Sequence, residues 1–160
     1  MPIAVTATPN QSAGSDSTPA RNNRPFFVAI AVLSVLGVAV SAISLQRHYA
    51  KSQSKFCDIA VQFNCDIVNR SEFSSFFGIP VAGIGVAGYG IVLALATIYR
   101  SRQWVPNILL AGAFAGLVFA LYLTYVEGFV LDTWCILCLG SLAIIASISS
   151  LAGVINTRMR

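Results

Sequence analysis

The chain has 160 residues, of which 56% are hydrophobic and only 10% are charged, and its mean hydropathy is +0.76. Soluble domains carry about 25% charged residues, so this composition excludes an ordinary soluble domain and indicates a membrane protein. The formal net charge is +4, and the arginines lie near the ends of apolar stretches. That distribution is typical of membrane orientation and argues against nucleic-acid binding.

The first part of the chain differs from the rest. Residues 1–24 are rich in Ser, Thr, Ala, Asn and Pro and hold a single acid, Asp16. Such a segment buries too little apolar surface to offset the entropy lost on ordering, so we expect a disordered cytoplasmic tail. Residues 25–156 are expected to form one membrane domain, and residues 157–160 a short cytoplasmic C-terminal tail.

Four apolar stretches are candidates for membrane-spanning helices, which need about 20 apolar residues each. They cover approximately residues 26–45, 79–99, 105–126 and 138–155. None of the four contains a charged residue. The predicted fold is therefore an all-α membrane protein, a bundle of four transmembrane helices with a long outer loop between the first and second helices.

Lys and Arg in short loops set the orientation of such a bundle. Six arginines fall on one face, which we expect to be cytoplasmic together with both termini: Arg21, Arg24, Arg100, Arg102, Arg158 and Arg160. On the opposite face, the loop between the third and fourth spans carries only the acids Glu127 and Asp132. This orientation places all four cysteines on the outer, oxidising side of the membrane, where disulfides persist.

Glycines are frequent in the second and third predicted spans. Small residues let helices approach closely in lipid, so packing within the bundle is the first interpretation. For Gly112 and Gly116 in the third span, homodimerisation is a second possibility. For Gly83 and Gly85 in the second, the missing side chains could instead leave room for a flat ligand.

Two cysteines form a CxxC motif, Cys135 and Cys138, at the start of the last span. Their spacing is about one helical turn, within disulfide reach, and a helix N-terminus stabilises a thiolate. Such a disulfide opens readily. The alternatives are an inert structural bridge or a metal site, but the chain has no second CxxC and its one histidine, His48, is expected at the membrane interface. We expect redox use and no metal.

The other pair, Cys57 and Cys65, is less specific and by itself would suggest a structural disulfide. Beside a CxxC on the same face, it is better interpreted as a shuttle pair. Electrons would pass from a reduced partner to this loop pair and then to the CxxC. The final acceptor is inferred by elimination, because the chain carries no haem, flavin or metal motif and a lipid-soluble quinone is available beside an apolar bundle.

The order of these features resembles the vitamin K epoxide reductase (VKOR) family in its bacterial and plant form. The resemblance covers roughly residues 26–156 and depends on Cys57-(seven residues)-Cys65, Ser71, Phe77-Gly78-Ile79-Pro80 and Trp134-Cys135-Ile136-Leu137-Cys138. It implies a four-helix bundle around a quinone (menaquinone, phylloquinone or ubiquinone) in a bacterial inner membrane or its equivalent. It also implies a multi-pass thiol–disulfide oxidoreductase that supports disulfide formation outside the cytoplasm.

The resemblance also implies roles for the cysteines. Cys138 would face the quinone ring, Cys135 would exchange with Cys65, and Cys57 would meet the partner protein. Residues expected to support the active site or bind the quinone are Ser71, Phe77, Gly78, Tyr89 and Trp134. For Ser71, a helix cap after Asn69-Arg70 is an equally good interpretation from the residues alone.

The sequence departs from animal members of the family, which hold the naphthoquinone with an Asn on the second helix and a Tyr four residues after the CxxC. An ungapped placement puts Val81 and Leu142 at these positions. A plain quinone acceptor is therefore expected in place of vitamin K epoxide. We expect a separate thioredoxin-like or DsbA-like partner, since the chain carries no such domain up to Arg160.

Two other functions remain open at this point. A DsbB-type quinone-linked oxidase also has four spans and two cysteine pairs, but its CxxC lies in the first outer loop, the reverse of the order here. A non-catalytic membrane subunit or assembly factor with two structural disulfides is a different class. Its bridges would resist mild reductant, whereas shuttle bridges would open and exchange.

Overall fold

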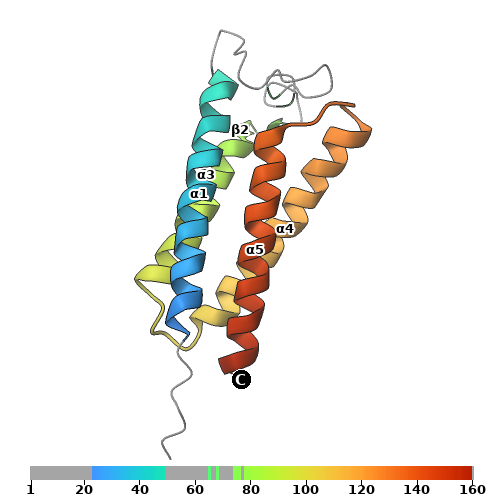
Figure 1. Ribbon diagram of the computed structural model, residues 1–160. Coiled ribbons are helices and arrows are strands. Elements are labelled where there is room, and N and C mark those ends of the chain that lie inside the picture. Colours follow the sequence, from blue (N-terminus) through green and yellow to red (C-terminus); the bar gives the residue numbers. More distant parts are fainter. Residues whose placement is uncertain (1–22, 50–64, 66–67, 69–73, 77, 160) are drawn as a thin grey trace, which may run out of the picture.

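The computed structural model describes residues 23–49, 65, 68, 74–76 and 78–159 (Figure 1). Within these ranges the chain forms four helices, α1 (Arg24–Tyr49), α3 (Val81–Thr97), α4 (Val105–Phe129) and α5 (Ile136–Met159). A short antiparallel hairpin of β1 (Ser75–Phe76) and β2 (Ile79–Pro80) precedes α3. The predicted all-helical architecture is confirmed, with this hairpin as an addition.

Three of these helices are long and apolar enough to cross a membrane, namely α1, α4 and α5. The fourth, α3, is equally apolar but has 17 residues, fewer than the roughly 20 that a span needs. It is shorter than the predicted stretch 79–99 because Pro80, with φ −58° and ψ 130°, is extended and belongs to the hairpin. Crossing by α3, and with it the four-span topology, stays a prediction.

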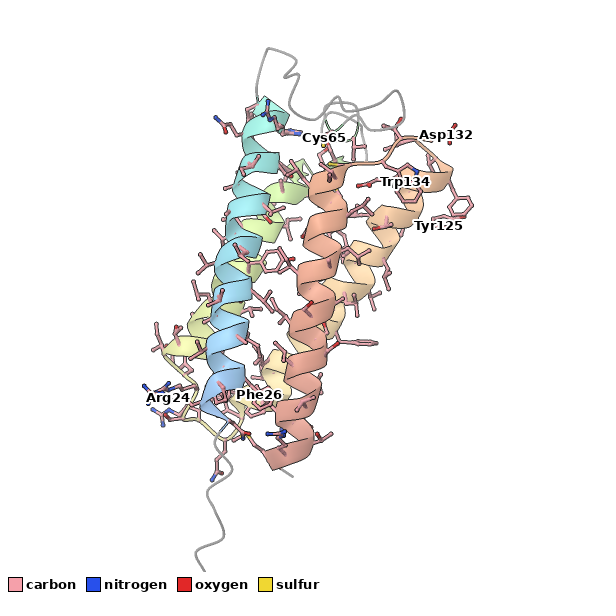
Figure 2. All side chains as sticks on the ribbon, in the orientation of Figure 1. Arg24, Phe26, Cys65, Tyr125, Asp132 and Trp134 are labelled. Carbon is pink, nitrogen blue, oxygen red and sulfur yellow. The ribbon has the colours of Figure 1, made fainter. Side chains whose placement is uncertain are left out.

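The helices run alternately up and down the bundle (Figure 1). Helix α1 packs against α3 and α5, and α4 packs against α5. The start of α1 and the end of α5 meet at one end, where the Arg158 guanidinium lies 4.5 Å from the centre of the Phe26 ring. Figure 2 shows Arg24 and Phe26 at this end and Cys65, Asp132 and Trp134 at the other. The end that holds Arg24 and Arg158 is therefore opposite to the end that holds the cysteines, where Arg47 also lies in the last turn of α1.

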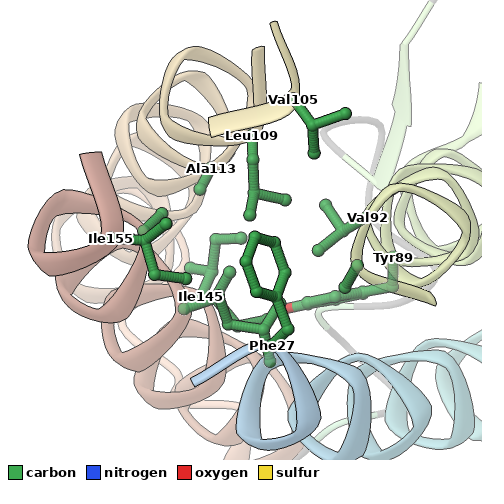
Figure 3. Close-up of a cluster of buried hydrophobic side chains, with 12 residues drawn as sticks. Phe27, Tyr89, Val92, Val105, Leu109, Ala113, Ile145 and Ile155 are labelled. Carbon is green, nitrogen blue, oxygen red and sulfur yellow. The ribbon is translucent and has the colours of Figure 1, made fainter. Parts of the chain in front are cut away.

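A buried apolar core joins all four helices (Figure 3). Its twelve members are Phe27, Ile30, Tyr89, Val92, Ala96, Val105, Leu109, Ala113, Ile145, Ile148, Ala152 and Ile155. Many large apolar side chains point away from this core and are half exposed, including Val32, Ile91 and Leu121. An exterior of this kind is suited to lipid, because contiguous exposed apolar surface is unusual on a soluble monomer.

Gly37 of α1, which the sequence pattern did not single out, lies close against α3. A Cβ atom there would lie 2.5 to 2.6 Å from ring atoms of Tyr89 on α3. The glycines that the sequence predicted to pack against other helices differ in how close their neighbours lie. A Cβ on Gly85 would meet the Ser41 hydroxyl at 2.7 Å, whereas one on Gly112 would meet nothing within 4 Å. Helix packing therefore explains some of the glycines and leaves Gly112 without a packing role.

We predict that Gly37→Ala destabilises the bundle, because the added methyl overlaps the Tyr89 ring. Overpacking of this kind costs about 1–3 kcal/mol. Unfolding of the purified protein in detergent, followed by circular dichroism, measures the loss. The matched control is Gly153→Ala on α5, where a Cβ meets nothing within 4 Å. Equal stability of the two variants would contradict the packing of Tyr89 on Gly37.

Candidate active site

The connection between α4 and α5 positions the CxxC motif. Beyond the end of α4 the chain turns sharply, with Asp132 at φ 47° and the Thr133 N–H donating to the Glu127 carbonyl at 3.1 Å. The Cys135 carbonyl then accepts from the Leu139 N–H at 3.0 Å. Cys135 is therefore the capping residue of α5, and Cys138 lies in the first helical turn, as the sequence predicted.

Three sulfurs gather at this helix end. Cys65 and Cys135 are 1% and 0% exposed and form a buried cluster with Val68, against which Cys138 packs. The Cys135 thiol is within hydrogen-bonding reach of the side chains of both Cys138 and Cys65. Figure 2 shows Cys65 over the start of α5. The structure thus brings together three of the four cysteines predicted as site residues, and Cys57 lies outside the described residues.

The electrostatics of Cys135 differ from the expected stabilised thiolate. Its hydrogen bond with the Cys138 side chain, and secondarily its burial, raise the pKa of the Cys135 thiol well above its ordinary value. The Cys138 backbone N–H at the helix start acts in the opposite direction, as expected, but this effect is smaller. In the dithiol state Cys135 therefore remains protonated at neutral pH.

A buried carboxyl that the sequence reasoning placed in a loop belongs to this site. Glu127 lies in the last turn of α4 and is only 2% exposed. Its Oε2 accepts a hydrogen bond from the Cys135 N–H at 3.2 Å, and its carboxyl lies beside the Cys138 side chain. Nothing in the sequence separates Glu127 from Asp132, which is exposed. The two acids differ only because the last turn of α4 directs the Glu127 side chain into the protein.

A cavity of about 240 Å³ begins at Cys138 and extends between the helices. All four described helices contribute to its wall, which is mainly apolar. Cys138 is part of the wall, whereas Cys65 and Cys135 lie outside it. Its polar groups come from Ser41, Ser44, His48, Ser74, Tyr89, Glu127 and Ser141.

Tyr89, a predicted site residue, is held in this wall by α5. Its hydroxyl donates to the Ser141 carbonyl at 2.9 Å and is also 2.9 Å from the Ser141 hydroxyl. Together with the packing of its ring on Gly37, this fixes the phenol across the bundle between α1 and α5. His48 likewise lines the cavity, with its Nδ1 3.4 Å from the Ser74 hydroxyl. The sequence indicated only an interfacial histidine.

The remaining predicted residues lie elsewhere. Gly78 occupies the hairpin turn at φ +80°, a conformation that favours glycine, and is not part of the cavity wall. Trp134 is also outside the wall, and its indole lies against Gly128, where a Cβ would come within 3.0 Å. Ser71 and Phe77 lie outside the described residues. The ligand-binding roles of these four residues stay predictions.

In the part of the chain that the structure describes, no group of three or more His, Cys, Asp or Glu side chains has the arrangement needed to hold a metal ion. Three clustered sulfurs, with Cys135 in contact with both Cys65 and Cys138 and with Cys138 on the wall of an apolar cavity, are instead suited to exchange of disulfide bonds.

We predict that Cys138 is alkylated before Cys135 in the reduced protein. Cys138 is partly exposed, whereas Cys135 is buried and its raised pKa keeps it as an unreactive thiol, even at mildly alkaline pH. Limiting N-ethylmaleimide followed by peptide mass spectrometry measures the order. Denatured protein, in which both cysteines should react alike, is the control, and faster labelling of native Cys135 would contradict the geometry.

Comparison with known protein families agrees with this site. The model of the vitamin K epoxide reductase family matches residues 28–152, a range that contains the cavity wall, Cys65 and the CxxC motif. That match bears out the resemblance drawn from the cysteine spacing, and with it the expectation of a membrane thiol–disulfide oxidoreductase. The chain belongs to the vitamin K epoxide reductase family.

Proposed function

We propose that this protein passes two electrons from a reduced thioredoxin-like partner through Cys57 and Cys65 to Cys135 and Cys138, and on to a membrane quinone. One observation carries the proposal: Cys135 is buried between Cys65 and Cys138, and of these three only Cys138 is on the cavity wall. Cys135 can therefore exchange with Cys65, whereas Cys138 can react with a ligand in the cavity. The net result is disulfide formation in proteins outside the cytoplasm.

The first step is exchange between the two cysteine pairs. The Cys65 thiolate attacks the Cys135 sulfur of the Cys135–Cys138 disulfide, and Cys138 leaves as a thiolate. Cys57 then attacks Cys65 in the mixed disulfide and releases Cys135. The loop pair is oxidised and the CxxC is reduced, so electrons balance. The contact between the Cys65 and Cys135 side chains supports this order.

The cavity fits a quinone ring in size and chemistry. An apolar protein cavity of about 150 Å³ is large enough to bind benzene, so about 240 Å³ accommodates a larger ring. Apolar walls with a few polar groups are typical of ligand sites, and Ser41, Ser44 and Tyr89 offer hydroxyls near Cys138. When bound, a quinone supplies an acceptor for two electrons and two protons. Cys138 presents the thiol to it, and Cys135 closes the disulfide.

The cavity wall also supports a plain quinone acceptor in place of an epoxide. Val81, at the position of the animal Asn, lines the cavity with an apolar side chain, and Leu142 is outside the described wall. Neither can donate a hydrogen bond to an epoxide or a naphthoquinone oxygen. Thiol oxidation with menaquinone, phylloquinone or ubiquinone as acceptor is the direction that fits.

We further propose that the cysteine-bearing end of the bundle faces the outer side of the membrane, with α3 completing a four-span topology. Exposed aromatic side chains lie near both ends: Tyr125, Phe129 and Trp134 near the cysteines, and Tyr99 and Trp104 near Arg100 and Arg102. Aromatic belts at both interfaces are typical of membrane proteins, and arginines favour the cytoplasmic side.

Contact between the two cysteine pairs argues against a non-catalytic subunit. Two independent structural bridges have no need to meet, whereas Cys65 here packs on Cys135. The discriminating experiment is anaerobic reduction of menaquinone and ubiquinone by the purified protein in detergent, with a small dithiol as donor.

In that assay we predict that Cys138→Ser abolishes quinone reduction, because it removes the sulfur on the cavity wall. Cys57→Ser is expected to block reduction by a thioredoxin-like protein while sparing a small dithiol, which can react at the partly exposed Cys138. The Cys135→Ser/Cys138→Ser double variant gives the background rate. If Cys57→Ser were as inactive as Cys138→Ser with the small dithiol, the proposed order of transfer would be wrong.

We also predict that Gly88→Leu raises KM for quinone by about tenfold or more, because its side chain would occupy a cavity that needs to admit a ring. A Cβ on Gly88 meets nothing within 4 Å, and Gly88 lines the cavity. Gly90→Leu on the same helix is the matched control, since its surroundings are also open but it is outside the described wall. Equal KM values for both variants would place the quinone elsewhere.

A further inference from the structure

The two acidic residues that the structure describes have opposite surroundings. Asp132 is exposed, whereas Glu127, five positions earlier, is 2% exposed and lines the same cavity as Cys138. Burying an ionisable carboxyl is costly, and such a group near the membrane core marks a functional site more often than a structural one. The relay of electrons described above gives Glu127 no role.

The two carboxyl oxygens of Glu127 differ in their contacts. Oε2 accepts the Cys135 N–H at 3.2 Å, which accounts for a structural role of that atom. Oε1 is buried and accepts no hydrogen bond from any described residue. The carboxyl as a whole is within hydrogen-bonding reach of the Cys138 side chain, so a base lies next to the thiol that needs to lose its proton.

Among the described residues of the cavity wall, no Lys or Arg is available to neutralise Glu127. Titratable side chains on the described cavity wall are His48 from α1, Tyr89 from α3 and Cys138 from α5, with Cys65 and Cys135 behind Cys138. Of these groups, Cys138 and the Cys135 N–H are the described contacts of the carboxyl.

The chemistry requires a proton carrier at this point. Oxidation of the Cys135–Cys138 dithiol to the disulfide releases two electrons and two protons, and formation of the quinol consumes both. The thiolate is the reactive form of cysteine, yet the wall around Cys138 is mainly apolar. A base beside the Cys138 sulfur can accept the thiol proton and so allow the thiolate to form in this apolar wall.

We propose that Glu127 is the proton carrier of the CxxC: it accepts the Cys138 thiol proton and delivers it to the quinone oxygen in the cavity. The inference rests on the proposed function. The Glu127 carboxylate takes the proton as Cys138 becomes a thiolate, and the S–S bond to Cys135 forms as two electrons leave. Before that bond closes, the Cys135 proton crosses its hydrogen bond to the Cys138 sulfur and leaves by the same carboxylate. Both protons end on the quinol, and Glu127 returns to the carboxylate.

The first test compares the wild type with E127Q in the dithiol-to-quinone assay from about pH 6 to 9. The amide oxygen of E127Q still accepts the Cys135 N–H, so the helix junction is kept while the base is lost. We expect a rate about 100-fold lower at neutral pH, as for loss of a general base. The difference should narrow as pH rises and solvent hydroxide replaces the carboxylate. E127D should recover part of the rate.

The second test does not depend on turnover. With Cys57, Cys65 and Cys135 replaced by Ser, the alkylation rate of Cys138 by iodoacetamide is measured against pH by mass spectrometry. A thiol and a carboxyl that share a proton titrate as a pair, so the wild-type Glu127 background should show two steps and E127Q a single one. Asp132→Asn, which removes an exposed carboxyl from the same connection, should retain both steps.

The outcomes separate this inference from the proposed function. If the wild type fails to reduce either quinone, the proposed function fails and the proton role with it. If the wild type is active but E127Q has the same pH profile and the same alkylation steps, only the proton role is overturned. A uniform loss of rate at every pH, with alkylation unchanged and no recovery in E127D, would reduce Glu127 to a structural contact and also overturn it.

Discussion

Burial of Cys135 at the junction of α4 and α5 is the constraint on which the rest of the site depends. The hydrogen bond from its N–H to Glu127 ties the end of one helix to the start of the next. Because Cys135 caps α5, the three-residue spacing of the motif then turns Cys138 toward the cavity. The middle sulfur is thus shielded from lipid and water, and the two sulfurs it contacts lie on different sides of it. In the proposed relay, this one helix cap separates the side that receives electrons from the side that passes them on.

The cavity exists because the helices pack unequally. Helix α1 approaches α3 closely, with Gly37 under the Tyr89 ring and Ser41 against Gly85. Helices α3 and α4 pack only loosely against each other. Glycines at positions 88 and 112, which line the cavity, add open space on these two helices. Tight packing on one side and missing side chains on the other leave room for a flat ring beside Cys138.

In the proposed mechanism, the Glu127 carboxyl and the CxxC sulfurs at one helix junction couple electron transfer to proton transfer. The Cys135 thiol is held protonated by its hydrogen bond with Cys138 and by burial, so its pKa is raised. The structure therefore places both a protonated thiol and a buried carboxyl beside the Cys138 sulfur. In an apolar wall, where water is scarce, such groups are the available means of moving the protons that accompany two electrons.

The sequence by itself determined much of this protein. Apolar runs located α1, α4 and α5 to within a few residues, because lipid demands long uncharged helices whatever their partners. The cysteine spacing and the Phe77-Gly78-Ile79-Pro80 motif identified the family, since exchange chemistry needs sulfurs at defined distances. Tyr89 was also predicted as a site residue and does line the cavity.

Only the tertiary structure decided which side chains face the cavity. Glu127 and Asp132 look alike in sequence, and the last turn of α4 buries one and exposes the other. The contact of Gly37 with Tyr89 joins two helices, so no periodicity within either one reveals it. The start of a helix was expected to stabilise the Cys135 thiolate, but the Cys138 side chain and burial outweigh this effect and raise the pKa of the thiol. Burial of this thiol is also set by tertiary packing. Local pattern sets where a helix begins and ends, whereas the surroundings of a side chain depend on which distant segments pack against it.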